Sequence, residues 1–207
     1  MFRHHIKSLL VFTGLLLVIG VHAGALEDGH TAFDAKHYKQ AYTLWKPLAQ
    51  RGDADAQYNL GLLYMNGLGV EKNDRMALMW FIRAGQQGLA DAQYNAGVMF
   101  YLGKGVYPSY ITAVKWWQLA AEKDHANAEN NLAVMYGNGQ GVQKNVVVAY
   151  ALHNLAIKNA PKGGAIRTEP IDMSTTGLTP RQLEEIKELA RQMSDHPIAA
   201  IDAYLAR

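Results

Sequence analysis

The sequence predicts an all-α fold, a solenoid built of 36-residue helix-turn-helix repeats and closed by a C-terminal capping helix. The first observation is that the segment 54–61, ADAQYNLG, returns as ADAQYNAG at 90–97 and in a more divergent copy at 126–133. The second is that a turn glycine, Gly67, recurs after the same interval in the next two copies. The third is that apolar residues within each half of a copy recur with the period of a helix. A fixed period of roughly 20 to 50 residues is typical of stacked repeat arrays.

The composition is that of an ordinary globular protein and excludes several classes of function. Of 207 residues, 49% are hydrophobic, 18% are charged and none is cysteine. Without cysteine the chain has no disulfide framework, no thiolate-bound zinc or iron–sulfur centre and no cysteine nucleophile. The formal net charge is +2, and two cations without nearby acids, Arg3 and Lys7, lie at the start of the chain. The rest is electrically balanced, so we expect no nucleic-acid partner.

Residues 1–25 have the three parts of a secretory signal peptide. A basic start is followed by an apolar run of 13 residues, Leu9–Val21, and then by small residues at Ala23 and Ala25. We expect cleavage after Ala25, with a cut after Ala23 as the alternative. An uncleaved membrane anchor is the other interpretation, but the run is shorter than the ~20 residues of a spanning helix. We therefore expect a bacterial protein exported to the periplasm or, alternatively, secreted, without stable membrane insertion after cleavage.

The segment 26–160 is expected to hold the repeats. A half-unit covers 27–52, and three full copies cover 53–88, 89–124 and 125–160. In each copy a first helix is predicted from apolar or small residues spaced i, i+4, i+7 and i+8. In the first full copy these residues are Ala56, Leu60, Leu63 and Tyr64.

A glycine turn and a second helix complete each copy. The turn is Gly67-Leu68-Gly69 in the first copy, because glycine adopts the positive φ values that reverse the chain without a steric clash. Short polar residues that accept hydrogen bonds from free helix N–H groups then begin the second helix: Asn73, Ser109 and Asn145. The buried stripe of the second helix in the first copy is predicted to be Ala77, Trp80, Phe81 and Ala84. Copies are expected to end at Gly52, Gly88 and Asp124.

These residues resemble the Sel1-like repeat, a 36-residue relative of the tetratricopeptide repeat. The resemblance rests on the pattern Ala…Leu-Gly-x-x-Tyr…Gly-x-Gly-Val…Ala-x-x-Trp…Ala and covers roughly 27–160. It implies a right-handed α/α solenoid that binds other proteins without catalysing a reaction. The last copy departs from the pattern, with Leu152-His153 where earlier copies have pairs of aromatic residues, and with Ala160-Pro161 in place of a glycine turn.

The C-terminal part is predicted to be a loop over 161–178 and capping helices over 179–207. The loop holds prolines, glycines and Ser174-Thr175-Thr176 without an apolar period. Thr179-Pro180-Arg181-Gln182 is a capping box with proline in the first turn. A last short helix is expected from Pro197 to Leu205. The amphipathic helix after the capping box can cover the open end of the stack.

No residue pattern predicts a catalytic centre, a metal site or a cofactor. Serines outside the leader lack the contexts that activate a nucleophile, and Ser109 is interpreted as a helix cap. No two histidines have the i, i+4 spacing of a helical metal site. His153 takes the place of Phe81 and Trp117, so we expect a packed ring rather than a catalytic base. Aspartates at helix starts are explained by the helix dipole: Asp53, Asp55 and Asp91.

The first helix of each copy is expected to line the concave face of the solenoid, the usual binding surface of such arrays. Positions off its buried stripe form the predicted partner-binding row: Asp55, Tyr58, Asn59, Leu62, Asp91, Tyr94, Asn95, Val98, Asn127, Asn130, Asn131 and Val134. This polar and aromatic row suits an extended peptide or a helix of a partner protein. Asn59, Asn95 and Asn131 have an alternative interpretation, which is that they hold the loops of the repeat itself.

The resulting hypothesis is a non-catalytic adaptor of the bacterial cell envelope that binds a partner protein or peptide. The identity of the partner and the oligomeric state are left open. Resemblance to cysteine-rich relatives implies a different class, a cell-wall hydrolase or penicillin-interacting protein, but this chain lacks their cysteines. A third interpretation is a binder of glycan or peptidoglycan fragments that stack on Tyr58 and Tyr94.

Overall fold

The computed structural model describes residues 24–161 and 177–207, and all regular structure in these residues is helical. Helix pairs recur at intervals of about 36 residues, which confirms the predicted all-α solenoid of helix-turn-helix repeats. No helix within these two ranges is long and apolar enough to cross a membrane. The predicted signal peptide, 1–25, lies almost wholly outside the described residues, as does most of the predicted loop, 161–178.

The chain divides into two compact units at Trp80, inside helix α4 (Asp74–Gln86). The other helices of the first unit are a segment over 24–34, α2 (Tyr38–Gln50) and α3 (Ala54–Asn66). Its core contains Leu60 and Leu63 of α3, which the helical period selects, together with Trp45 of α2. Apolar burial on one face of each helix therefore holds this unit together.

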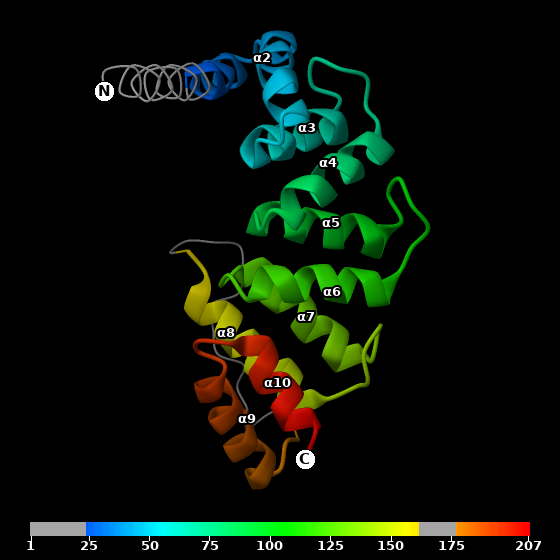
Figure 1. Ribbon diagram of the computed structural model, residues 1–207. Helices are drawn as coiled ribbons and strands as arrows, with labels where there is room; N and C mark the ends of the chain where they lie inside the picture. Colours follow the sequence, from blue (N-terminus) through cyan, green and yellow to red (C-terminus); the bar gives the residue numbers. More distant parts are fainter. Residues whose placement is uncertain (1–23, 162–176) are drawn as a thin grey trace, which may run out of the picture. The chain divides into compact units, whose positions relative to one another are not determined.

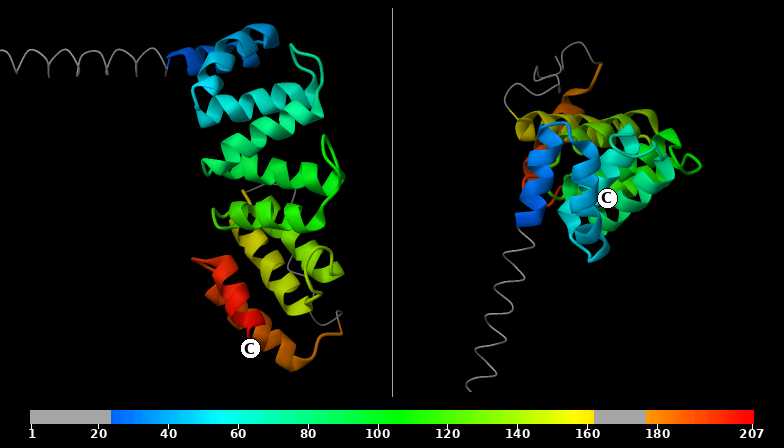
Figure 2. Two further views of the ribbon diagram at one scale, coloured as in Figure 1. Left: turned by 45° about the vertical axis from the view of Figure 1, so that its right-hand side comes forward. Right: turned by 90° about the horizontal axis from the view of Figure 1, so that it is seen from above.

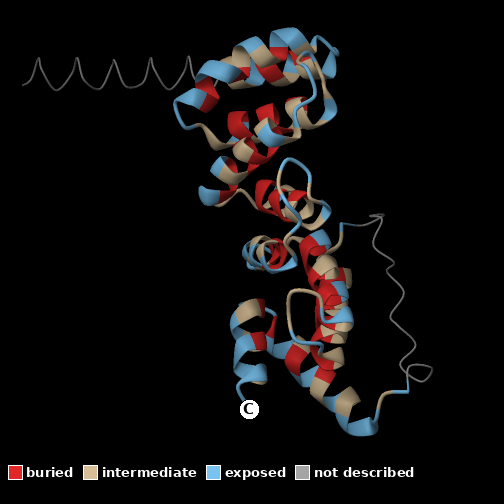
Figure 3. Ribbon diagram, turned by 90° about the vertical axis from the view of Figure 1, so that its right-hand side faces the viewer, coloured by how far each residue is buried: buried red, intermediate tan, exposed pale blue. Residues whose placement is uncertain are grey.

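The described residues of the second unit contain the end of α4 and six further helices. They are α5 (Ala90–Leu102), α6 (Tyr110–Ala121), α7 (Ala126–Asn138), α8 (Val146–Asn159), α9 (Pro180–Gln192) and α10 (Pro197–Leu205) (Figure 1). Its core is rich in alanine, including the fully buried Ala113, Ala120 and Ala151. Figure 3 shows that buried residues lie where neighbouring helices of this unit face one another and exposed residues on their outer faces. Small side chains at these contacts let the helix axes approach closely.

The two adjacent tryptophans of α6 have different surroundings. Trp117 is buried, with 2% of its surface exposed, and donates a hydrogen bond from Nε1 to the carbonyl of Tyr94 at 3.2 Å. Trp116 is half-buried and lies close to Gly85, where an added Cβ would be 3.0 Å from Cζ3 of the indole. Both rings therefore have packing partners within the second unit, and Trp116 is not an isolated surface ring.

Short polar side chains begin the helices as predicted. The Oγ of Ser109 accepts a hydrogen bond from the backbone N–H of Thr112 at 3.3 Å, and Oδ1 of Asn145 accepts one from Val148 at 3.0 Å. Asp124 has a φ of +56°, which confirms that it replaces the glycine at the end of its copy. These caps satisfy backbone groups that a helix terminus leaves without partners.

Helices α9 and α10 pack against the end of the second unit (Figure 2). The capping box forms as predicted, because Thr179 accepts a hydrogen bond from the N–H of Gln182 and the Gln182 side chain accepts one from the N–H of Thr179. Ile186 and Leu189 of α9 are buried in the same core as α8. The N–H of Ile198 donates to Oε1 of Glu122 at 2.9 Å, which ties the start of α10 to the end of α6.

Candidate functional site

The predicted partner-binding row begins on α3, in the first unit. Asp55 is exposed, and Tyr58 and Leu62 are half-buried. Asn59 is buried, with 7% of its surface exposed. The side chain of Asn59 therefore offers little surface to a partner, which agrees with the alternative interpretation that this asparagine serves the repeat itself.

On α5, in the second unit, the row is joined by a histidine that the sequence analysis did not assign to it. Asp91 is exposed, whereas Tyr94, Asn95 and Val98 are half-buried. The His125 ring stacks on Tyr94 with a centroid distance of 4.7 Å, and its Nε2 lies 3.2 Å from Oδ1 of Asp91. The signal for this contact is that His125 stands where the first copy has the capping residue Asp53.

Both ring nitrogens of His125 are engaged in structural hydrogen bonds. The Nδ1 accepts a hydrogen bond from the backbone N–H of Ala128 at 3.2 Å and thereby caps α7. An acceptor at Nδ1 places the proton of the neutral ring on Nε2, which then donates to Asp91. With neither nitrogen left for a substrate, His125 serves as a capping and linking residue rather than as a general base.

On α7 the row ends with a mixture of polar and apolar surface. Asn127 is exposed, and Asn130 and Asn131 are half-buried. Val134 is one of the more exposed large apolar side chains of the described chain, at 47%. Single exposed apolar side chains are normal on protein surfaces, so Val134 is singled out by its place on the predicted row and not by its exposure alone.

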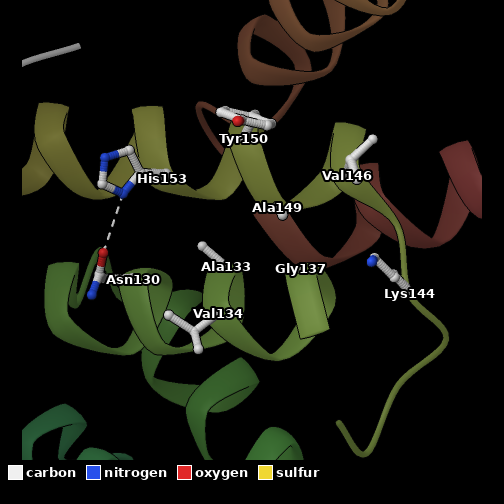
Figure 4. A pocket seen from close by; sticks show the side chains of 9 residues that line it. All are labelled: Asn130, Ala133, Val134, Gly137, Lys144, Val146, Ala149, Tyr150 and His153. Atoms are coloured by element: carbon white, nitrogen blue, oxygen red, sulfur yellow. Dashed lines mark hydrogen bonds between the residues drawn. The ribbon is translucent and has the colours of Figure 1, made fainter. Parts of the chain in front are cut away.

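Next to Val134 a pocket of about 350 Å³ opens between α7 and α8 (Figure 4). Residues from both helices and from the turn before α8 line it: Asn130, Ala133, Val134, Gly137, Lys144, Val146, Ala149, Tyr150 and His153. Small aliphatic side chains form its middle, the Asn130–His153 pair one end and Lys144 the other. Its volume is near the lower end of the roughly 300–1,000 Å³ range of ligand sites, so it has room for one large side chain or a small molecule.

His153 takes part in the wall of this pocket, as a packed ring rather than a free base. Its Nδ1 lies 3.2 Å from Oδ1 of Asn130, and the ring is half-buried. Burial lowers the pKa of His153 below its ordinary value, because the charged imidazolium loses hydration. The ring is therefore neutral at pH 7 and contributes a flat, hydrogen-bonded surface to the pocket.

Gly137 contributes to the pocket without being required by the backbone. It lies in the last turn of α7, and an added Cβ would meet only the Cβ of Ala149, at 3.8 Å. That distance is an ordinary van der Waals contact, so alanine fits here. Glycine within a helix costs about 1 kcal/mol relative to alanine. The space beside Gly137 is thus left empty by a residue that makes the helix less stable than alanine would.

A buried carboxyl group that sequence analysis missed lies on α7, directly before Asn130 in the sequence but not among the residues that line the pocket. Glu129 is fully buried, its Oε1 accepts a hydrogen bond from Nδ2 of Asn159 at 2.7 Å, and its Oε2 has no hydrogen-bond partner among the described residues. Burial, with a smaller contribution from the nearby charge of Asp124, raises the pKa of Glu129 to about 7. The signal was present in the repeat, since Glu129 replaces Gln57 and Gln93 of the earlier copies.

The earlier glutamines show what that position does. Nε2 of Gln57 donates to the carbonyl of Ala49 at 3.1 Å, and Nε2 of Gln93 donates to the carbonyl of Gly85 at 2.9 Å. Each bond joins the first helix of a copy to the helix before it. The position is therefore structural, and the carboxyl group of Glu129 belongs to the packing of the repeat.

The remaining titratable groups form no cluster suited to metal binding. Within residues 24–161 and 177–207, no group of three or more His, Cys, Asp or Glu side chains is placed to hold a metal ion. The acidic and basic residues of α9 pair along the exposed helix surface instead, as in the Arg181–Glu185 pair at 2.9 Å. The site is thus best described as a partly exposed row of polar and apolar side chains with an adjoining pocket.

Comparison with known proteins identifies the family of the repeats. The sequence profile described as "Sel1 repeat" matches residues 54–89, 90–125 and 126–160, which together make up more than half of the chain. The chain belongs to the Sel1 repeat family. Proteins of this family are generally non-catalytic interaction scaffolds. A comparison with curated proteins finds no match for this Sel1 repeat protein.

Two solved structures of similar proteins agree with the fold. One is c5321, described as a protective antigen present in uropathogenic Escherichia coli strains displaying an SLR fold, with 33% identity and a TM-score of 0.65. The other is a Sel1 repeat protein from Oxalobacter formigenes, with 30% identity and a TM-score of 0.63. Each match covers 68% of the present chain, which spans 31% of the first protein and 59% of the second.

Proposed function

We propose that this Sel1 repeat protein is a non-catalytic scaffold that binds a partner protein or peptide through the α5–α7 part of the predicted row. The observation that carries the proposal is the exposure of Asp91, Asn127 and Val134 on helices whose other faces are buried. A mixed polar and apolar surface fits a transient complex, because the interfaces of such complexes are about as apolar as the rest of a protein surface. The general role of the family supports the same class of function.

The proposal includes export to the bacterial cell envelope. It is supported by the sequence of residues 1–25, with its basic start, apolar run and small residues before the expected cut. We expect the chain recovered from the periplasmic or extracellular fraction to begin at Leu26, or at Gly24 if the alternative cut is used. Intact-mass spectrometry measures this directly. Recovery of the uncleaved chain in the cytoplasmic fraction would contradict the export proposal.

A photo-cross-linking experiment tests the binding surface. A photoreactive amino acid at Val134 is expected to give a discrete cross-linked product with a protein of the cell envelope, several-fold stronger than the same group at Leu119. Leu119 is a matched control, because it is a large apolar side chain of the same unit that is 50% exposed, against 47% for Val134. Equal yields at the two positions would count against a specific contact at α7.

A further inference from the structure

The pocket between α7 and α8 occupies a place that aromatic rings fill in the preceding copy. Positions 36 residues apart are equivalent in successive copies. In the preceding copy the Tyr101 ring contacts those of Tyr110 and Trp117, with centroid distances of 5.3 Å and 5.7 Å. Their equivalents in the last copy are Gly137, Val146 and His153, all of which line the pocket. Three large rings are therefore replaced by smaller side chains at a single place in the fold.

The replacement is only partly compensated by neighbouring residues. Gly97, against which Trp117 packs, becomes Ala133, which adds one methyl group. Val114 becomes Tyr150, whose ring lies at the rim of the pocket in Figure 4. The pocket remains open to solvent, and its middle is lined by aliphatic side chains. The last copy therefore has a pocket where the preceding copy has packed aromatic rings.

The charge of the pocket favours a ring with a carboxylate beside it. Lys144 carries the one permanent charge among the nine lining residues and stands where the preceding copy has Pro108. His153 is neutral at pH 7, so it does not add a second positive charge. A cation at one end of an aliphatic slot complements an aromatic residue followed by an acidic one.

We propose that this pocket binds a tryptophan side chain of the partner protein, with an aspartate or glutamate next to it directed at Lys144. The proposal rests on the scaffold function above and names the chemistry of the partner. The segment 162–176 contains no aromatic residue in its sequence, so it does not supply the ring. The bound indole takes the place of the Tyr101 ring of the preceding copy, which Gly137 leaves without a side chain.

Three blocked peptides and NMR spectroscopy of the ¹⁵N-labelled chain test the proposal. The probes are acetyl-Gly-Trp-Glu-Gly-amide, its Trp-Gln analogue and its Leu-Glu analogue. The first is expected to shift the amide signals of Ala133, Gly137 and Ala149. The Leu-Glu peptide is expected to bind at least tenfold more weakly, because it lacks the ring. The Trp-Gln peptide is expected to bind about two- to fivefold more weakly, the range of one exposed ion pair.

Variants of the pocket distinguish binding there from binding elsewhere. Gly137→Tyr restores the side chain of Tyr101 and is expected to abolish the shifts, whereas Leu119→Tyr on α6 leaves them unchanged. Gly137→Ala adds a single methyl group that fits beside Ala149, so it is expected to raise the thermal midpoint while weakening peptide binding. It keeps the test valid if the tyrosine variant does not fold. Lys144→Gln is expected to make the Trp-Glu and Trp-Gln peptides bind equally.

The outcomes separate this inference from the proposed function. Equal binding of the tryptophan and leucine peptides, or unchanged binding to Gly137→Tyr, would overturn the aromatic pocket. A strong cross-link at Val134 that survives in Gly137→Tyr would retain the scaffold function while overturning the pocket as its binding site. Selective tryptophan binding without any cross-linked partner would retain the pocket while contradicting the scaffold function.

Discussion

Replacement of Glu129 by glutamine is expected to remove a loss of about 3 kcal/mol in the free energy of unfolding, which the native chain undergoes between pH 4 and pH 8. The magnitude follows from the pKa, because burial raises it from 4.5 to about 7 and each unit corresponds to about 1.4 kcal/mol. Glutamine is neutral at every pH and loses nothing by ionising. It also restores the side chain that joins helices in the earlier copies, where Gln93 donates to the carbonyl of Gly85. The equivalent carbonyl for residue 129 is that of Ala121.

The sign of the pH dependence follows from which state holds the proton more tightly. Between pH 4.5 and about 7 the folded protein keeps the Glu129 proton while the unfolded chain releases it. The unfolded state then binds fewer protons, so stability falls as the pH rises through this window. The contribution is complete below pH 4.5 and is lost above about pH 7. Asp124, which raises the pKa, and Lys158, which lowers it, are the charges near the carboxyl group.

Urea denaturation between pH 4 and 9 measures the effect as a difference between two proteins. The free energy of unfolding of Glu129→Gln minus that of the native chain is expected to rise across the window and then stay constant. Glu184→Gln is the matched control, because it makes the same change at an exposed position of α9. A difference that does not change with pH would show that Glu129 is not protonated in the folded state near neutral pH.

The sequence predicts the fold in detail because the same local signals for helices and turns recur in each copy of the repeat. Turn glycines, the polar caps of the second helices and the apolar stripe agree across copies, so a chance match at one position does not decide the assignment. The side chains of Ser109 and Thr179 each accept a hydrogen bond from the backbone N–H group three positions later. The residue type and its spacing are enough to predict such a cap. Local chemistry of this kind is readable from a sequence.

The candidate site is less predictable because it depends on contacts between copies. The linking role of His125 requires Asp91 and Tyr94 to lie beside it, 34 and 31 positions earlier in the chain. The burial of Asn59 depends on which residues pack over α3, and the residue pattern of α3 does not predict them. The pocket was missed for a related reason, because it forms where large side chains are missing and no residue pattern marks it. It becomes visible when Gly137 is compared with its equivalent, Tyr101.

Truncation of Trp117 to alanine is expected to lower the free energy of unfolding by about 3–5 kcal/mol, the range for removal of a buried aromatic side chain. The indole is 2% exposed, hydrogen-bonded to the carbonyl of Tyr94 and packed on the ring of Tyr101. Its loss leaves a cavity between α5 and α6. Trp116→Ala is the control on the same helix, and its half-buried ring makes a smaller loss expected. Urea denaturation followed by circular dichroism measures both. Equal losses would contradict the assignment of Trp117 as the core residue.

The glycine opposite Trp117 allows a stricter test of the same packing. An added Cβ at Gly97 would lie 2.5 Å from Nε1 of the indole, so Gly97→Ala alone is expected to cost about 1–3 kcal/mol by overpacking. In the last copy the equivalent positions hold Ala133 and the smaller ring of His153, which both line the pocket. In the Trp117→His background, Gly97→Ala is therefore expected to cost less than about 0.5 kcal/mol, because the indole that it would clash with is gone. The double-mutant cycle measures this coupling directly. Additive effects would show that the size of the ring at position 117 is not the reason why α5 needs glycine at position 97. The open pocket of the last copy would then have a cause other than the loss of its aromatic residues.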